Sequence, residues 1–441
     1  MSGKGLILAA PASGSGKTLI TAGLLRHLGH RGIRVAAAKA GPDYIDPTFH
    51  ALASGAPCLN LDAWAMRPAT LARLVRDLES AAELVLCEGV MGLFDGTGPD
   101  GETGSTAELA RVTGWPIALV VDAGGQGASM AALVEGFARH DPRAPLAGII
   151  LNHVASPRHK ALLIEAIGRH LPELPVLGAM MRDQSLNLPA RHLGLIPAGE
   201  GPNIEALIER AASRLANDVD IDRLIALAGS SRCGSLPGAP GLAPLGQHIA
   251  VASDDAFLFA YQATLAGWRR QGAEISTFSP LADAAPHPAA DAVYLPGGYP
   301  ELHAGKLAAA ARFLAGLREA AAAGKAIYGE CGGYMVLGEA LIDAAGTPHR
   351  LAGLLPLVTS FAAPRRHLGY RAATLLKSGP LGAAGARFRG HEFHYASIVE
   401  EAGTDPLFAL SDGWGADLGS AGLHRGTVAG SFIHLIDRED E

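Results

Sequence analysis

Short apolar segments alternate with longer stretches of helical character along most of the chain. Continuous apolar runs separated by helices are typical of parallel sheets covered by helices. The pattern therefore predicts an α/β fold in both halves of the chain. The apolar segments behind this prediction span residues 84–89, 117–124, 147–154, 248–255, 291–298 and 325–333, and the most pronounced Ala-rich helical stretch spans 303–323.

The segment 229–246, GSSRCGSLPGAPGLAPLG, interrupts this alternation. It is rich in Gly, Pro and Ser and lacks the apolar periodicity of a strand or helix, so we interpret it as a linker. A chain of 441 residues is also long for one compact core. We therefore expect a first domain over residues 1–228 and a second over residues 247–441.

Composition narrows the class of protein. With 49% hydrophobic and 18% charged residues and no apolar run of membrane length, we expect a soluble protein without a membrane partner. The apolar segment 5–10 is too short for a signal-peptide core and leads into a phosphate-binding pattern, so a cytoplasmic location is expected. A formal charge of −7 argues against nucleic acid as the main partner. The four cysteines, without CxxC spacing, indicate neither disulfides nor structural zinc.

Residues 5–18 have the order strand, PASGSGKT loop and helix. Glycines let the backbone N–H groups of such a loop surround a phosphate chain, while Lys17 reaches the outer phosphates and Thr18 can ligate Mg²⁺. Pro11 stands where the strict pattern has Gly, so the loop is a variant; the alternative is a Gly/Ser turn that precedes a lysine by chance. The expected nucleotide-binding residues are Ser13, Gly14, Ser15, Gly16, Lys17, Thr18 and Lys39.

Further polar groups stand at strand ends, where ligands bind in open α/β sheets. Lys39 opens a turn that carries Asp43 and Asp46, which could hold a metal or orient a nucleophile. Aspartates in a Gly/Pro turn are more often simple turn residues. Glu88 emerges after the apolar run LVLC, where Mg²⁺ is expected; a structural glutamate is the alternative. We interpret Cys87 as core packing.

The segment 326–334, AIYGECGGY, places Cys331 on a sharp strand-to-helix turn with small neighbours. Such an elbow exposes the sulfur at the carboxyl edge of the sheet and directs a helix N-terminus at it, which lowers the thiol pKa. We expect Cys331 to be a nucleophile, with an oxyanion hole formed by the N–H groups of Gly298 and Gly332. Among seventeen histidines, His434 is the expected base.

A second polar cluster, HEFHY at residues 391–395, is as consistent with a structural role as with a functional one.

Together these segments resemble the cobyrinic and hydrogenobyrinic acid a,c-diamide synthases of the cobalamin pathway. APASGSGKT, KAGPDYIDP, CEGVMGLFDG, VVDAGGQGAS, GIILNHVASPRH, YLPGGYPEL, GECGGYM and RGHEFHY look like that family's motifs in the family's order, over nearly the whole chain. The first half is similar to dethiobiotin synthetase, and the second to a class I glutamine amidotransferase. The resemblance implies a P-loop parallel-sheet domain followed by a glutaminase α/β domain.

By this resemblance, the protein is a carbon–nitrogen ligase that uses ATP and glutamine to amidate the a and c acetate groups of a tetrapyrrole polycarboxylate. The reaction passes through an acyl phosphate, which ammonia from glutamine converts into an amide. The implied ligands of Mg²⁺ are Thr18, Glu88 and Asp46; the implied acyl-phosphate site contains Asp43, Asp46 and Asp95; and the implied glutaminase pair is Cys331 and His434.

Basic groups must gather locally to bind such an anionic macrocycle, because the protein is net negative. Arg182, Arg191 and His192 are candidates, with ordinary surface charge as the alternative.

One position departs from other class I glutaminases. Those commonly have Glu two residues after the catalytic histidine, whereas Ile436 stands there in this chain. The sequence therefore leaves open which group orients His434.

Other functions remain open at this point. Cobyric acid synthases and nickel-sirohydrochlorin diamide synthases share these motifs, and a P-loop ATPase switch or a binding module with a degenerate glutaminase half are the alternatives outside this class. The sequence also leaves open whether the macrocycle contains cobalt, how strictly ATP is required, and whether the chain forms a homodimer.

Overall fold

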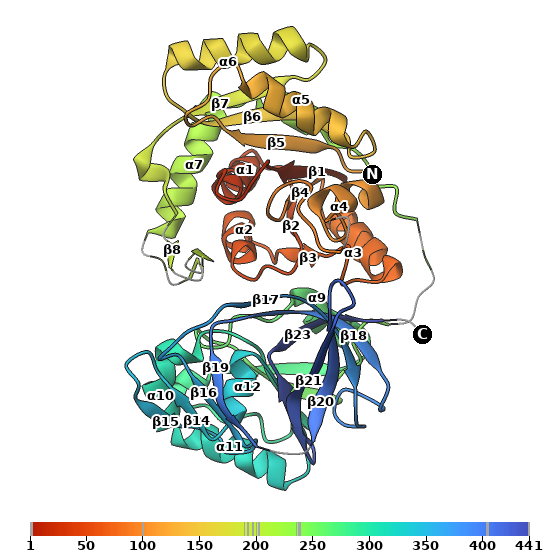
Figure 1. Ribbon diagram of the computed structural model, residues 1–441, viewed down its shortest axis with the longest axis vertical. Helices are drawn as coiled ribbons and strands as arrows, with labels where there is room; N and C mark the ends of the chain where they lie inside the picture. The colour runs from red at the N-terminus through yellow and green to blue at the C-terminus, as the bar shows by residue number, and fades with distance from the viewer. Residues whose placement is uncertain are drawn as a thin grey trace. The chain divides into compact units, whose positions relative to one another are not determined.

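The chain folds into two compact units, the first drawn from red to green and the second from green to blue in Figure 1. The first consists of Met1–Trp64 and Pro68–Gly238, and the second of Ala65–Arg67 and Ala239–Glu441. The computed structural model describes residues 3–98, 101–188, 190–191, 194–195, 198–199, 201, 203–234, 236, 240–402 and 405–439.

The first unit is built on a parallel seven-stranded sheet with the order β3-β2-β4-β1-β5-β6-β7. Its strands are β1 (Lys4–Ala9), β2 (Val35–Ala40), β3 (Leu59–Leu61), β4 (Leu84–Glu88), β5 (Ile117–Asp122), β6 (Leu146–Val154) and β7 (Val176–Met181). The central strands are buried almost throughout, as their continuous apolar sequence predicts.

Helices connect these strands in the expected alternation. They are α1 (Lys17–His30), α2 (Asp46–Ser54), α3 (Pro68–Ala81), α4 (Thr106–Thr113), α5 (Met130–His140), α6 (Pro157–His170), α7 (Ile204–Asp218) and α8 (Ile221–Leu227); η1 (Gln184–Leu186) and the pair β8 (Ala190–Arg191) and β9 (Gly194–Leu195) are short additions. In Figure 1, α1 lies beside α7, and α5 beside α6. The predicted P-loop parallel-sheet fold is confirmed.

The second unit has a mixed ten-stranded sheet with the order β11-β10-β12-β13-β22-β21-β20-β17-β18-β23. Its parallel part contains β10 (His248–Ala252), β11 (Glu274–Phe278), β12 (Ala292–Leu295), β13 (Ala326–Glu330) and β22 (Val428–Ser431). Its antiparallel part contains β17 (His367–Leu375), β18 (Arg387–His394), β20 (Pro406–Asp412), β21 (Asp417–Arg425) and β23 (Ile433–Arg438).

Helices and a smaller sheet complete the second unit. The helical segments are α9 (Gln262–Arg270), η2 (Pro280–Ala282), η3 (Pro300–His303), α10 (Ala304–Ala309), α11 (Ala311–Ala322) and α12 (Gly332–Leu337). The four-stranded sheet has the order β15 (Pro348–Arg350), β14 (Ala340–Ile342), β16 (Leu357–Ser360) and β19 (Ser397–Glu401). The amidotransferase fold predicted for this half is confirmed.

The Ala-rich stretch 303–323, expected to be helical, is divided into two helices. The break falls at Ala310, whose ψ is 76°. The Asp283 carboxylate accepts a hydrogen bond from the Phe313 N–H at 2.9 Å, so a donor in the first turn of α11 is satisfied by another segment. Tertiary contacts, rather than helix propensity, therefore set this boundary.

The N-terminal part of the predicted linker contacts the first unit. Gly229 pairs with Gly5, and the Ser231 N–H and hydroxyl both donate to the Glu79 carboxylate at 2.8 Å. Within the described part of the chain, no helix combines the length and the apolar character needed to cross a membrane.

Candidate functional site

A glycine-rich loop joins β1 to α1. Gly14 and Gly16 have φ angles of 81° and 91°, a left-handed conformation that glycine adopts without strain. Asn152, on β6, donates to the Ser15 carbonyl at 3.0 Å, and a Cβ on Gly16 would lie only 2.2 Å from the donating nitrogen. Glycine is therefore required at position 16 both by the backbone angle and by the close approach of Asn152.

Lys17 and Thr18 begin α1 and reach toward the ends of neighbouring segments. The Lys17 ammonium donates to the Met91 carbonyl at 2.7 Å, and the Thr18 hydroxyl donates to Glu88 Oε1 at 2.8 Å. Burial lowers the Lys17 pKa, and the Glu88 charge opposes this effect. The loop lysine, the loop threonine and the carboxylate at the end of β4 thus come together.

A network of buried charges lies beside this loop. Lys39 Nζ lies 2.5 Å from Asp46 Oδ2 and 3.2 Å from Glu88 Oε1, and His50 Nε2 lies 2.5 Å from Glu88 Oε2. Burial opposes the charge on Lys39, but Asp46 and Glu88 outweigh it and raise the Lys39 pKa. Burial likewise opposes the charge on Glu88, but Lys39 and His50 lower its pKa to about 2. Glu88 is therefore ionised at neutral pH.

The other two aspartates of the predicted site are held by backbone groups. Asp43 Oδ1 accepts hydrogen bonds from the Ile45 and Asp46 N–H groups at 2.7 and 3.2 Å. Asp95 Oδ2 accepts one from the Gly92 N–H at 2.9 Å. The Asp43 contacts are those of a turn residue, yet Asp43 also raises the pKa of Asp46, after burial itself.

Sequence reasoning missed two members of this site, His50 and Asn152. His50 stands alone in an Ala-containing helix, and no sequence signal marks it. Asn152 lies near the carboxyl end of the buried strand β6, and Glu88 was identified at the corresponding end of β4, so the same rule could have found it. Of the candidate macrocycle-binding residues, Arg182 is exposed. The side chain of Arg191 and all of His192 lie outside the described residues.

In the second unit, Cys331 occupies a strained turn between β13 and α12. Its φ of 47° and ψ of −103° are rare for a residue with a side chain. Its N–H donates to the Ser431 carbonyl at 2.8 Å, which fixes the turn to β22. This is the elbow that the sequence predicts.

The two glycines expected to form an oxyanion hole lie close together. A Cβ on Gly332 would be 2.9 Å from the Gly298 nitrogen. The Gly332 N–H is hydrogen-bonded toward the Cys331 thiol, which lowers the thiol pKa. A Cβ on Gly298 would lie 2.1 Å from the Ala256 carbonyl oxygen. The lack of side chains therefore lets these backbone segments approach each other beside the sulfur.

His434, on β23, lies beside the same turn and is 1% exposed. A Cβ on Gly297 would be 2.4 Å from His434 Cε1, 3.2 Å from Cys331 Cβ and 3.3 Å from His434 Nδ1. The two predicted catalytic side chains therefore converge on one point above Gly297.

The sequence led us to expect a lowered pKa for the Cys331 thiol, and the structure indicates the opposite. Burial, with the Glu301 charge next in size, raises the pKa of Cys331, and the short helix α12 and the Gly332 N–H do not compensate. Burial, followed by His391 and His394, lowers the pKa of His434 to about 3. At pH 7 the pair is therefore a neutral thiol and a neutral imidazole that can accept its proton.

One further group was missed, Glu330, which directly precedes Cys331. It is 3% exposed, and burial raises its pKa to about 7 although Leu435 and Tyr294 donate hydrogen bonds to it. Its Oε2 lies 3.8 Å from His434 Nδ1.

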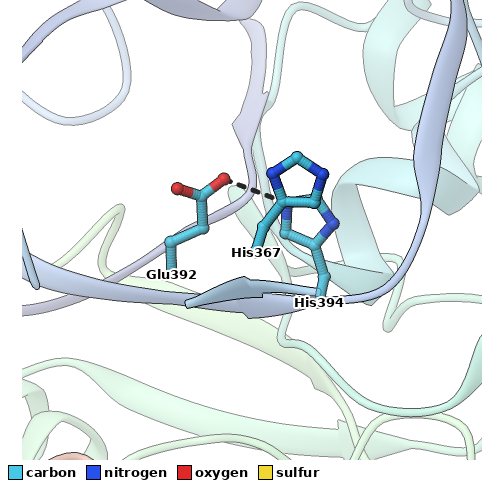
Figure 2. A group of neighbouring side chains, drawn as sticks. All are labelled: His367, Glu392 and His394. Carbon is cyan, nitrogen blue, oxygen red and sulfur yellow. Dashed lines mark hydrogen bonds and ion pairs between the residues drawn. The ribbon is translucent and has the colours of Figure 1, made fainter. Parts of the chain in front are cut away.

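The polar cluster of residues 391–395 borders the thiol, since the Phe393 carbonyl lies 3.8 Å from the Cys331 sulfur. Glu392 receives a hydrogen bond from Arg371 Nε at 2.7 Å and lies 2.9 Å from His394 Nε2. Figure 2 shows Glu392 beside the stacked rings of His367 and His394, whose planes differ by 4°. Since Arg371 already offsets the Glu392 charge, we interpret the cluster as an ion-pair network along the site.

Comparisons with known proteins agree with this arrangement. Residues 6–196 match the CobQ/CobB/MinD/ParA nucleotide binding domain, and residues 248–441 match the CobB/CobQ-like glutamine amidotransferase domain.

Full-length relatives are also found. The chain is 54% identical over 436 residues to a protein of Brucella anthropi, 52% identical over 437 residues to one of Rhizobium meliloti, and 53% identical over 436 residues to one of Rhodobacter capsulatus. Each alignment covers 98% of this chain and 98 to 99% of the relative, and each relative is named hydrogenobyrinate a,c-diamide synthase.

Proposed function

The chain belongs to the hydrogenobyrinate a,c-diamide synthase family, and from this premise we propose that it amidates the a and c acetate groups of hydrogenobyrinic acid in cobalamin biosynthesis. It is an amidating ligase with a glutamine amidotransferase domain and a nucleotide binding domain. The observation that carries the proposal is that one chain holds both a buried Cys331–His434 pair at an elbow and a phosphate loop beside a carboxylate–lysine network.

Glutamine is the nitrogen donor in this proposal. The Cys331 sulfur attacks the side-chain amide carbon, His434 takes the thiol proton, and the N–H groups of Gly298 and Gly332 bind the developing oxyanion. The protonated His434 then gives its proton to the departing ammonia. Water hydrolyses the remaining thioester and releases glutamate. The low His434 pKa favours this return of the proton.

ATP is the proposed source of activation at the phosphate loop. The backbone of residues 13–16 and the ammonium groups of Lys17 and Lys39 neutralise the phosphates, and a substrate carboxylate attacks the γ-phosphate in the region of Asp43, Asp46 and Asp95. Ammonia displaces phosphate from the resulting acyl phosphate and forms the amide. Repetition on the second acetate gives the diamide.

Mg²⁺ fits the donor set of this site. The Thr18 hydroxyl and the Glu88 carboxylate lie 2.8 Å apart, and both are oxygen ligands of the kind that Mg²⁺ prefers. Asp46 reaches the same region through Lys39, which contacts both carboxylates. Bound there, Mg²⁺ would supply positive charge to the phosphates.

The two activities divide along the chain in this proposal. Residues 1–228 form the synthetase domain, residues 229–246 the linker and residues 247–441 the glutaminase domain. The proposed location of the protein is the cytoplasm.

The first prediction separates the two activities. Cys331→Ala should abolish amide formation from glutamine, because it removes the nucleophilic thiol. Synthesis from ammonium chloride should persist, since the phosphate loop is untouched. Product mass, measured with hydrogenobyrinic acid, ATP and Mg²⁺, reports both reactions.

Two controls complete this experiment. Cys58→Ala, at a buried cysteine of the first unit, should leave both reactions intact. Replacing hydrogenobyrinic acid by its cobalt-containing form tests the choice of macrocycle. If the wild-type protein added no amide to either macrocycle from either nitrogen source, the proposed function would be wrong.

A further inference from the structure

Glu330 is a buried carboxyl group that the mechanism above does not use. It ends β13, immediately before the nucleophile, and pairs across the sheet with Ser431. His434 follows Ser431 by three residues. The fold therefore places the residue on the N-terminal side of Cys331 against the imidazole, although nothing in its sequence position relative to His434 suggests such a contact.

The Glu330 carboxylate is held from two sides. Oε1 accepts the Leu435 N–H at 3.0 Å, and Oε2 accepts the Tyr294 hydroxyl at 2.7 Å. Oε2 also lies 3.8 Å from His434 Nδ1. Both hydrogen bonds come from neutral donors, so the negative charge of Glu330 is not neutralised by them. The His434 ring is a neighbour that can take the opposite charge.

The other charged groups around His434 are less suited to stabilise its imidazolium form. His391 and His394, on β18, disfavour an imidazolium because they can themselves carry positive charge. Glu392 favours it, but this carboxylate already accepts from Arg371 and contacts His394. The titratable groups around Glu330 itself are His434, the Cys331 thiol and the hydroxyl groups of Tyr294 and Tyr328.

We propose that Glu330 is the positioning residue of His434, replacing the glutamate that is absent at position 436. The inference rests on the proposed function of the Cys331–His434 pair. Glu330 Oε2 attracts the Nδ1–H of the imidazole, which leaves the Nε2 lone pair for the Cys331 proton. A spacing of 3.8 Å is longer than a hydrogen bond, so the contact acts through the charge that His434 acquires when it takes the Cys331 proton.

The pKa of Glu330, raised by burial to about 7, supports this role. Proton transfer from Cys331 to His434 creates a positive charge beside Glu330. An ionised Glu330 stabilises that charge, and the new imidazolium in turn favours the ionised carboxyl group.

The test compares Glu330→Gln with the wild-type protein. Synthesis from glutamine should fall by about tenfold or more, while synthesis from ammonium chloride stays unchanged. Glu401→Gln is a matched control, because Glu401 also accepts from a tyrosine, Tyr334, and should retain both reactions. A Glu330→Gln variant with wild-type use of glutamine would overturn the inference, whereas a wild-type protein without synthesis from either nitrogen source would overturn the proposed function instead.

A second readout separates positioning from a merely structural role. Iodoacetamide reacts with the thiolate form of Cys331. The pH profile of the alkylation rate therefore shows how easily the thiol loses its proton in the presence of His434. Without Glu330 the imidazolium loses its partner, and the profile should move to higher pH with an unchanged plateau. Glu330 also raises the Cys331 pKa by its charge, so a move to lower pH would mean simple repulsion and would overturn the proposal.

Tyr294→Phe also tests whether Glu330 positions His434, in a variant that keeps the Glu330 carboxylate. It removes one donor that holds Oε2 in place, so glutamine-dependent synthesis should fall by a smaller factor than in Glu330→Gln. Should Glu330→Gln not fold, this variant decides: unchanged use of glutamine and an unchanged alkylation profile would reject a positioning role.

Discussion

Buried ionisable residues behave differently at the two sites. In the first unit, Lys39 and Glu88 are charged because each offsets the burial of the other, and Glu88 keeps a pKa of about 2. In the second unit, Cys331 and His434 are both buried without such compensation, and burial favours their neutral forms. The first arrangement suits binding of phosphate and metal, whereas in the second charge arises only when the proton moves from the thiol to the imidazole.

At the residue scale, Glu330 makes stability depend on pH. Its pKa in the folded protein, about 7, lies above the ordinary value of 4.5, so the folded state holds the proton more tightly than the unfolded state. The free energy of unfolding should therefore fall as pH rises from about 4.5 to about 7. Each pKa unit corresponds to about 1.4 kcal/mol, so the loss is on the order of 3 kcal/mol.

Glu330→Gln should remove this dependence. The difference in the free energy of unfolding, variant minus wild type, should therefore increase from pH 5 to pH 8. Urea denaturation of both proteins at both pH values measures it. Comparing the two pH values cancels the hydrogen bonds that glutamine makes or loses. A difference between the two proteins that does not change with pH would contradict the prediction.

At the scale of elements, the elbow works because the loop after β12 approaches it without side chains. Gly297→Ala would place a Cβ 2.4 Å from His434 Cε1 and 3.2 Å from Cys331 Cβ. We expect the variant to lose most of its glutamine-dependent synthesis, because the imidazole must move, while ammonium-dependent synthesis persists. Gly267→Ala, in α9, is the control, since its nearest neighbour would be a flexible arginine end at 3.9 Å. Equal loss in both variants would argue against the elbow as the cause.

The sequence predicted elements that have a strong local signature. Parallel strands are continuous apolar runs, and the turns at Lys17 and Cys331 combine small residues with a reactive group, so the sequence predicted the parallel strands and the two turns that carry the candidate sites. The antiparallel part of the second sheet was not, because a strand such as β21 is mostly exposed and has no apolar run.

Contacts made by single polar residues also could not be predicted from the sequence. His50 is brought to Glu88 by helix α2, and Glu330 is brought to His434 by the pairing of β13 with β22. Glu330 lies within the GECGGYM motif, but nothing in that motif marks it as a partner of the histidine. The roles assigned to the site residues remain predictions that the variants above test.

At the scale of the whole molecule, Ala65–Arg67 belongs to the second unit although its neighbours in sequence belong to the first. The Arg67 guanidinium contacts the Asp437 carboxylate through Nε at 3.1 Å and Nη2 at 3.0 Å, and Asp437 is fully buried. In such a bidentate ion pair, each group neutralises the charge of the other. Removal of the arginine would leave a buried carboxylate without its cationic partner.

Arg67→Ala should therefore destabilise the second unit by about 3 to 5 kcal/mol, the usual cost of breaking a buried ion pair from one side. Hydrogen–deuterium exchange in urea, measured by mass spectrometry on peptides from each unit, follows the two units separately. Peptides of the second unit should exchange at lower urea in the variant, with those of the first unit unchanged. The double variant Arg67→Leu/Asp437→Leu should recover part of the lost stability, because neither charge of the pair is then left buried. A larger loss of stability in the double variant would show that the packing of the two side chains, and not their charge, stabilises the unit.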